Sequence, residues 1–254
     1  MLLRMTNVSK NFGGVNALSD ISFDVKHGDI LGIIGPNGAG KTTLFNLITG
    51  VFSVSTGKIV FDDRVLGNLP SHKITEFGIA RTFQNIRLFD SMTVLENILV
   101  GEHCRMSTGV LAGIFKTGKQ RREELKAVER AHRLLTFMGL RDDADQLAGA
   151  LSYGKQRRLE IARAMASSPQ LLLLDEPAAG MNDSETEELR QLIGRIRYEY
   201  NMSVVIIEHD MNLMMNICNR LVVLNFGSKI AEGTPEEIQH NLAVIEAYLG
   251  KESA

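Results

Sequence analysis

Residues 31–48 read Leu31-Gly-Ile-Ile-Gly35-Pro-Asn-Gly-Ala-Gly-Lys41-Thr-Thr-Leu-Phe-Asn-Leu-Ile48, and this stretch decides the fold. Leu31–Ile34 is short and apolar, as a buried strand is, and Thr43–Ile48 has helical spacing. Between them, Gly35–Thr42 matches G-x-x-x-x-G-K-[ST], in which glycines let backbone N–H groups turn toward one centre. Because a helix N-terminus attracts anions, the stretch predicts a phosphate site. The alternative is a glycine-rich turn without a ligand.

Three side chains of this loop have separate predicted roles. Lys41 places its charge on the β- and γ-phosphates of a nucleotide, Thr42 ligates Mg²⁺, and Thr43 adds a donor near the α-phosphate. The predicted nucleotide-binding residues here are Gly35, Pro36, Asn37, Gly38, Ala39, Gly40, Lys41, Thr42 and Thr43.

A second apolar run ends in two acids. Leu171–Leu174 predicts a buried strand, and Asp175 and Glu176 follow it directly. Ligands of α/β sheets bind at the carboxyl ends of strands. We therefore expect Asp175 to hold Mg²⁺ through water and Glu176 to polarise the water that attacks the terminal phosphate. Many strands end in acids, so this pattern gains its meaning from the phosphate loop.

A third apolar run, Ser203–Ile207, is followed by polar residues that include His209. A histidine after a strand is often a surface or capping residue. Here a third parallel strand would bring it to the sheet edge that carries Lys41 and Glu176. The arrangement favours a sensor of the γ-phosphate.

The remaining pattern predicts one α/β domain with a helical insertion. The three buried runs suit parallel strands covered on both faces. From about Val94 the chain becomes charged and helical, with a helix over Gln120–Met138, and strands resume at Leu171. We predict a single domain over 1–254, with a catalytic core over 1–92 and 167–254 and a helical subdomain over 93–166. Antiparallel strands are expected near the N-terminus, at Leu2–Val8, Ile21–Val25 and Lys58–Phe61.

Composition argues against several classes of protein. The 254 residues have a formal net charge of −2, which offers no field for DNA or RNA, and the basic run Lys119–Arg122 is expected to be solvated. Cys104 and Cys218 lack metal-ligand spacing and are expected to stay reduced. No apolar run approaches the ~18 residues that cross a bilayer, and nothing marks the N-terminus for export. Met211–Met215 is expected in the core.

The stretch Leu151-Ser-Tyr-Gly-Lys-Gln-Arg-Arg-Leu-Glu-Ile-Ala-Arg163 lies upstream of the acid pair. Ser152 is expected to cap a helix whose positive N-terminus makes a second anion site. The stretch resembles the signature of ABC ATPases, and the phosphate loop, Gln84, signature, acid pair and His209 follow in that family's order. The resemblance implies a P-loop NTPase (RecA-like) parallel sheet core, an N-terminal antiparallel β subdomain and an inserted helical subdomain.

The resemblance covers roughly residues 3–250 and implies features beyond the residue-level reasoning. It implies a head-to-tail dimer, with ATP between the loop of Lys41 in one subunit and Ser152 and Gly154 of the other. Phe12 falls where the family has an aromatic that stacks on adenine; the alternative is a core phenylalanine. Gln84 falls at the Q-loop, which touches Mg²⁺ or water and links the site to a membrane subunit.

The implied activity is ATP hydrolysis coupled to transport. ATP binding closes two subunits, and Glu176 acts as the base that orients water toward the γ-phosphate. Lys41, Mg²⁺ and His209 then stabilise the charge on the transferring group. Gln84 is the candidate for transmitting closure to a permease.

Three residues depart from the family pattern. Tyr153 and Lys155 replace a glycine and the glutamine of the signature, and Asn182 stands where aspartate is usual. Tyr153 bears on how closely the opposite subunit approaches. The missing charge at Asn182 is expected to weaken coupling across the dimer.

The departures also resemble the LivG-type subunits of branched-chain amino acid importers. Four stretches are similar to these subunits: the signature with its tyrosine, Glu176–Asn182, the insertion Gly101–Gly118 and the tail Glu232–Gly250. The tail is also similar to the lipopolysaccharide-export ATPase. The resemblance implies a second, LivF-type ATPase, two membrane permeases, an external solute-binding protein, and a peripheral position at the cytoplasmic face of the plasma (inner) membrane. Val110–Phe115 in the insertion is expected to pack locally or meet a partner.

Other functions stay open at this point. A lipopolysaccharide-type exporter and a urea importer share the same cassette architecture. A soluble ABC ATPase of translation or DNA repair usually has two cassettes, coiled-coil insertions or basic arms, whereas this chain is slightly acidic. A P-loop kinase leaves Leu151–Arg163 unexplained. The transported solute is chosen by other subunits, so these residues do not identify it.

Overall fold

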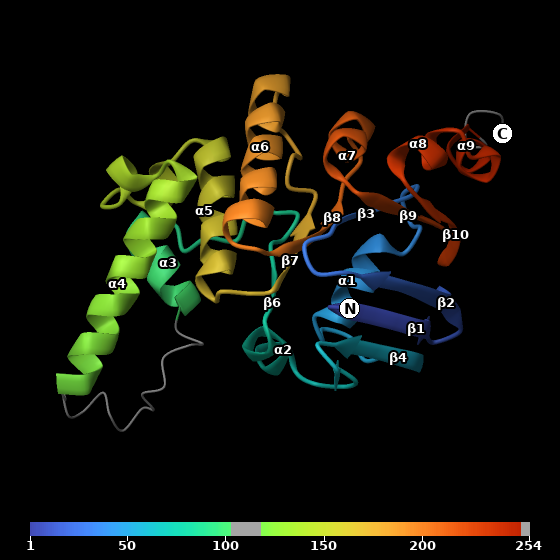
Figure 1. Cartoon of the computed structure of the whole chain (residues 1–254), viewed down its shortest axis with the longest axis horizontal. Coiled ribbons are helices and arrows are strands. Elements are labelled where there is room, and N and C mark those ends of the chain that lie inside the picture. The colour runs from blue at the N-terminus through green and yellow to red at the C-terminus, as the bar shows by residue number, and fades with distance from the viewer. Residues whose placement is uncertain (103–117, 250–254) are drawn as a thin grey trace.

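The computed structural model describes residues 1–102 and 118–249, and its centre is a six-stranded sheet of order β10-β9-β3-β8-β7-β6 (Figure 1). Within it the pairs are parallel, except that β10 runs antiparallel to β9. The three predicted buried strands are neighbours at its centre, which confirms the α/β fold class. The strands are β3 (Ile30–Ile34), β6 (Ile79–Arg81), β7 (Leu171–Asp175), β8 (Ser203–Ile207), β9 (Arg220–Asn225) and β10 (Ser228–Gly233).

The predicted antiparallel strands form a second sheet of order β2-β1-β4-β5. Its strands are β1 (Leu3–Phe12), β2 (Val15–Val25), β4 (Thr56–Phe61) and β5 (Arg64–Val65). β1 and β2 are longer than the sequence indicated, because register shifts between Met5 and Asn11 break the two-residue alternation. Gly13 and Gly14 join these strands with φ of 50° and 102°, values that suit a tight turn of glycines.

The helices gather around the parallel sheet, with α3, α4 and α5 at one end of the molecule and α8 and α9 at the other (Figure 1). In chain order α3 to α5 lie between β6 and β7, where the helical insertion was expected. The exact division at 93–166 stays a prediction. The helices are α1 (Lys41–Ile48), α2 (Ser71–Phe77), α3 (Val94–Glu102), α4 (Gly118–Met138), α5 (Tyr153–Ala166), α6 (Asp183–Glu199), α7 (Met211–Ile217), α8 (Pro235–Gln239) and α9 (Leu242–Leu249), with short 3₁₀ turns η2 (Arg141–Asp143) and η3 (Ala148–Ala150).

Two hydrophobic cores cover the two faces of the parallel sheet. Leu173 and Val205 pack in the core shared with α1 and the antiparallel sheet. The next residues along the same strands, Leu174 and Ile206, pack in the core shared with α5, α6 and α7. Successive side chains of a strand point to opposite faces, so a sheet covered on both sides needs unbroken apolar strands. This is why the strands read as continuous apolar runs.

Two sequence predictions fall on residues that the structure does not describe, namely the packing of Val110–Phe115 and the reduced state of Cys104. Cys218 is buried, and its burial raises the pKa of the thiol to about 12, as expected of an inert cysteine. Met214 is fully buried in the helix-side core, whereas Met211 and Met215 are only half-buried. Among the described helices, none combines the length and apolar character needed to span a bilayer.

Candidate functional site

The loop between β3 and α1 has a backbone shape that depends on glycine. Gly35, Gly38 and Gly40 have φ of 151°, 80° and 102°. A Cβ on Gly35 would lie 2.1 Å from the carbonyl oxygen of Leu224, which leaves no space for a side chain. The first turn of α1 reads Lys-Thr-Thr-Leu with no acid, so its N-terminal N–H groups keep their positive field. The loop therefore has the form of an anion cradle.

A cavity of about 510 Å³ opens at this loop. Its walls come from the loop and α1, from the residues that follow β7 and β8, from the start of β2 and from the β9–β10 turn. The lining residues are Val15, Asn16, Ala17, Asn37, Gly38, Ala39, Gly40, Lys41, Thr42, Thr43, Glu176, His209, Phe226 and Gly227. The structure thus brings most of the predicted phosphate-loop residues together with the predicted base and histidine. Gly35 and Pro36 are not part of this lining.

Lys41 is folded back onto its own loop. Its Nζ donates to the carbonyl oxygens of Gly35 at 2.7 Å and Pro36 at 3.1 Å, and the residue is only 6% exposed. Burial of an ammonium group requires such partners. Gly35 and Pro36 therefore position the lysine charge beside the cavity that Lys41 lines.

Asp175 ends β7 as a buried carboxylate, 3% exposed. Its Oδ2 accepts a hydrogen bond from Arg81 Nη2 at 2.7 Å, and Arg81 Nη1 donates to Asn46 Oδ1 of α1 at 2.7 Å. Arg81 thus ties the acid of β7 to the helix that follows the phosphate loop. This role of Arg81 was not predicted from the sequence, although the residue lies three positions before Gln84.

Glu176 lies between the two other predicted polar residues of the site. Its Oε2 accepts from Gln84 Nε2 at 2.7 Å, and its Oε1 lies 2.9 Å from His209 Nε2. The backbone of Glu176 has φ of 47°, which is uncommon for a residue with a side chain, and its N–H donates to Ile207 O of β8 at 2.8 Å. The turn after β7 is therefore tied to β8, and three loops converge on one carboxylate.

Glu208 holds the loops after β7 and β8 together and was not singled out from the sequence. This buried carboxylate accepts from Ala178 N at 2.6 Å and from His209 N at 2.9 Å. Burial raises its pKa, and the backbone N–H groups that bind it act in the opposite direction. Glu208 orders the backbone of His209, a role that the sequence signalled only by placing an acid beside the histidine.

The family model described as "ABC transporter" matches residues 18–179, more than half of the chain. The chain belongs to the ABC transporter family. It is an ATP-binding cassette, and members of this family bind and hydrolyse ATP. A second family model, described as "Branched-chain amino acid ATP-binding cassette transporter", matches residues 228–254.

Individual proteins are similar over almost the whole cassette. The high-affinity branched-chain amino acid transport ATP-binding protein BraF of Pseudomonas aeruginosa is 47% identical over 98% of both chains. The high-affinity branched-chain amino acid transport ATP-binding protein LivG of Escherichia coli is 46% identical over 98% of both chains. A crystal structure of the ADP conformation of an ATP-binding cassette of an ABC transporter superposes with a TM-score of 0.86 at 34% identity, covering 98% of each chain.

Dimers occur among related cassettes. A dimeric structure of a post-hydrolysis state of an ATP-binding cassette, bound to ADP and Pi, superposes with a TM-score of 0.77 at 26% identity. It covers 92% of this chain and 99% of that one.

The signature of this ABC cassette lies apart from the cavity. Ser152 occupies the N-cap position of α5, as predicted, but within the described contacts its hydroxyl makes no capping hydrogen bond. Its backbone carbonyl instead accepts from Gln156 N at 2.9 Å. The expectation that the Ser152 side chain caps the helix was therefore wrong. Neither Ser152 nor Gly154 lines the phosphate-loop cavity of its own subunit.

Two departures from the family pattern have local partners. Lys155 forms an ion pair with Asp143 at 2.8 Å. Asn182 is the N-cap of α6: its side chain accepts from Glu185 N, and Glu185 Oε2 accepts from Asn182 N, both at 3.0 Å. Such a reciprocal capping box satisfies two N–H groups that the helix leaves without partners. Asn182 therefore caps α6, although it stands where the family usually has an aspartate.

Phe12 lies at the end of β1, opposite Val15 in the hairpin. The ring is 40% exposed and contacts Phe52 edge-on at 5.0 Å between centroids, so the alternative of a core phenylalanine does not hold. Val15 lines the phosphate-loop cavity, whereas Phe12 does not. Stacking of Phe12 on adenine stays a prediction.

The Q-loop backbone is held by a buried ion pair of α5. Arg157 and Glu160 are 0% and 2% exposed and lie 2.8 Å apart. Arg157 donates to the carbonyl oxygens of Phe83 and Gln84 at 2.8 and 2.9 Å. Glu160 Oε1 accepts from the N–H groups of Phe83 and Arg87, both at 3.3 Å. The sequence indicated an arginine-rich helix here but not that its charges face inward.

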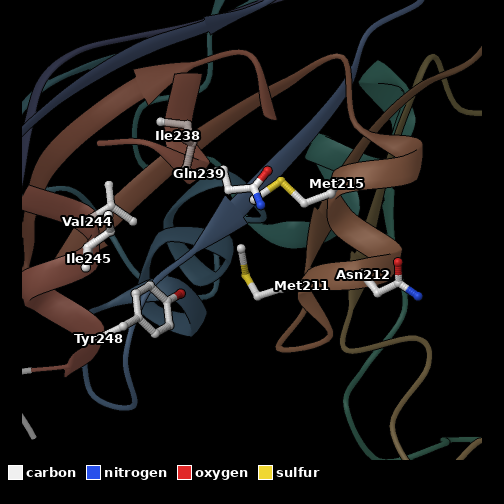
Figure 2. A pocket seen from close by; sticks show the side chains of 8 residues that line it. All are labelled: Met211, Asn212, Met215, Ile238, Gln239, Val244, Ile245 and Tyr248. Atoms are coloured by element: carbon white, nitrogen blue, oxygen red, sulfur yellow. The ribbon is translucent and has the colours of Figure 1, made fainter. Parts of the chain in front are cut away.

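A separate apolar pocket of about 550 Å³ lies between α7 and the C-terminal helices. Figure 2 shows its lining, which consists of Met211, Asn212, Met215, Ile238, Gln239, Val244, Ile245 and Tyr248. None of these residues lines the phosphate-loop cavity. The prediction that Met211–Met215 belongs to the core therefore holds for Met214, whereas Met211 and Met215 border this pocket.

Proposed function

We propose that this chain is the ATP-hydrolysing subunit of an importer of branched-chain amino acids. The observation that carries the catalytic part is the position of Glu176, whose two carboxylate oxygens lie within hydrogen-bond distance of Gln84 and His209 beside the phosphate-loop cavity. The solute class is supported by the names of relatives that are 46–47% identical along nearly the full chain. The match of residues 228–254 to a branched-chain amino acid cassette model supports it further.

The contacts of Glu176 support a role as general base. A base must lie within hydrogen-bond reach of the water that it activates, and apo contacts commonly rearrange when substrate binds. Gln84 and His209 fix the carboxylate at the cavity, so one of its oxygens can exchange a side-chain partner for water. Lys41 and His209 line the same cavity, which supports assigning the lysine charge to the phosphates and the histidine to the γ-phosphate. Positioning and electrostatics supply the rate in such reactions.

The residues present suit Mg²⁺ that is held mainly by nucleotide phosphates. Among the described residues there is no cluster of three acidic, histidine or cysteine ligands. Mg²⁺ in nucleotide sites commonly uses only one or two carboxylates beside phosphate oxygens. Thr42 lines the cavity, whereas Asp175, directly before Glu176, is buried outside this lining with Oδ2 bound to Arg81. We therefore assign Thr42, Asp175 and Gln84 to the metal, which neutralises phosphate charge when bound.

The second anion site supports pairing of two cassettes. The Ser152 hydroxyl makes no capping bond and, like Gly154, lies outside the cavity of its own subunit. Both are therefore available to the nucleotide of a second cassette arranged head to tail. The dimeric structure of a related cassette bound to ADP and Pi supports pairing of two cassettes. The second cassette is a LivF-type subunit or a second copy of this chain.

An exposed apolar surface follows the Q-loop and supports attachment to membrane permeases. Phe89, Met92 and Leu147 are 45%, 36% and 51% exposed. Met92 N donates to Phe89 O, and the neighbouring Thr93 bridges Leu147, so the three belong to one region. Exposed apolar clusters commonly mark protein contacts. Two permeases bound here would place the chain at the cytoplasmic face of the inner membrane, and the external solute-binding protein would act only through them.

The test of this function is Glu176→Gln in the full chain, assayed with the subunits that co-purify with it. We expect ATP binding to be retained and hydrolysis to fall at least ~100-fold, with a closed dimer trapped by ATP. Uptake of leucine, isoleucine and valine by cells carrying this variant should fall in parallel. The matched control is Glu246→Gln on exposed α9, which should hydrolyse ATP at the wild-type rate. Hydrolysis by Glu176→Gln at that rate would exclude Glu176 as the base, and unchanged uptake of all three amino acids would exclude the solute class.

A further inference from the structure

Tyr153, the residue that replaces a signature glycine, makes specific contacts across the structure. Its hydroxyl donates to the carbonyl oxygen of Ala179 at 2.8 Å and accepts from Arg157 Nη2 at 3.2 Å. Its side chain packs on Gly180. A Cβ atom built on this glycine would lie 3.7–3.8 Å from the nearest atoms of the Tyr153 side chain. Although the residue is 44% exposed, its polar end is therefore engaged on two sides.

The partner of this hydroxyl, Arg157, is the centre of a buried network. Arg157 is wholly buried and pairs with Glu160. The same guanidinium donates to the Q-loop carbonyls of Phe83 and Gln84. Losing a partner of a buried charged group carries a large desolvation cost, so these contacts hold their geometry together. The signature helix and the Q-loop consequently behave as one packed unit.

Tyr153 extends this unit to a third element. Ala179 lies in the loop between β7 and α6, the loop that begins at Glu176. At the other end, Gln84 donates its side chain to Glu176. Two series of contacts therefore connect the start of α5 to the carboxylate of Glu176. One passes through Ala179 and the other through Arg157 and Gln84.

We infer that Tyr153 is a positioning residue for hydrolysis, whose hydroxyl couples the signature end of the cassette to Gln84 and Glu176. The inference rests on the proposed function. When Ser152 and Gly154 meet the nucleotide of the second cassette, α5 is displaced or fixed, and the Tyr153–Arg157 contact passes this change to the Q-loop. A subunit thereby hydrolyses its own ATP efficiently only while its signature end is engaged. The tyrosine does not touch the substrate.

The experiment is Tyr153→Phe, which removes the hydroxyl and keeps the ring. We expect kcat for ATP hydrolysis to fall about fivefold, with KM changed less than about twofold, because one hydrogen bond of the network is lost while nucleotide contacts remain. In a Gln84→Ala background the same change should reduce kcat by less than in the wild type, because the contacts through the Gln84 side chain are already lost and only those through Ala179 remain. Tyr153→Gly, which restores the family's glycine, should lose at least as much rate.

The control is Tyr198→Phe on α6, a tyrosine that is 89% exposed, which should leave kcat unchanged. Every variant should melt well above the temperature of the kinetic assay, so that a loss of kcat reflects positioning and not unfolding. A kcat for Tyr153→Phe within twofold of wild type overturns the inference, as does a full wild-type rate for Tyr153→Gly. A further fivefold loss in the Gln84→Ala background also overturns it. These results leave the Glu176→Gln test untouched, so failure here is distinguishable from failure of the proposed function.

Discussion

The phosphate-loop end and the signature end of this cassette are both helix N-termini, yet different groups hold them in place. α1 follows a loop whose course is set by positive-φ glycines such as Gly35 and Gly40. α5 is held by side chains from elsewhere, with Tyr153 bonded to Ala179 and Lys155 paired with Asp143. The first end is fixed by local backbone geometry and the second by tertiary contacts. Substitutions should therefore have larger effects at the first end than at the second.

The largest effect is expected from Gly35→Ala. The new Cβ would lie 2.1 Å from Leu224 O, a backbone atom that cannot move without shifting β9. Steric overlap together with the unfavourable φ should destabilise the fold by at least about 3 kcal/mol, measured as the free energy of unfolding in urea. Gly194→Ala in α6 is the matched control, since its Cβ would meet nothing within 4 Å. That change should stabilise the chain by roughly 0.5–1 kcal/mol. Equal stabilities would show that the glycine loop tolerates a side chain.

This contrast explains why the phosphate loop and the strands around it could be predicted from the sequence. A strand, a glycine pattern and a helix within 18 consecutive residues specify the loop, because the glycines have no alternative at those backbone angles. The buried strands were readable for a similar reason, since a sheet covered on both faces requires apolar residues at every position. Glu176 and His209 followed from the rule that parallel strands end at one edge. Their 2.9 Å contact agrees with that rule.

The next effect concerns Lys41→Ala. Removing the ammonium group should weaken binding of ATP at least ~100-fold in titration calorimetry, because charge-assisted hydrogen bonds to phosphate oxygens are lost. The fold should survive, since the course of the loop is set by its positive-φ glycines and not by the ammonium group. Lys58→Ala on exposed β4 should bind ATP with wild-type affinity. Unaltered affinity in Lys41→Ala would refute the assignment of the phosphate loop.

The signature half was less predictable because its contacts join residues that are distant in sequence. Arg157 reaches Gln84 across 73 positions, and Arg81 reaches Asp175 across 94. No periodicity distinguishes an inward-facing arginine from a solvated one when both lie on a charged helix. Ser152 does occupy the predicted N-cap position of α5, but its hydroxyl does not form the capping hydrogen bond expected from the residue type. The inward-facing charges beside the signature are therefore fixed by tertiary contacts that the sequence pattern does not encode.

The smallest effect is expected from Lys155→Gln, which restores the family's glutamine in the signature. Lys155 has a side chain 45% exposed, so its pair with Asp143 is screened and should contribute only about 0.5 kcal/mol to stability. Asp143 also keeps its hydrogen bond from Gln146. A double-mutant cycle with Asp143→Asn, measured by urea unfolding, isolates the pair, and its coupling energy should shrink as salt is raised. A coupling energy above about 2 kcal/mol that persists in salt would contradict this expectation. It would mean that the signature end is held as rigidly as the glycine loop.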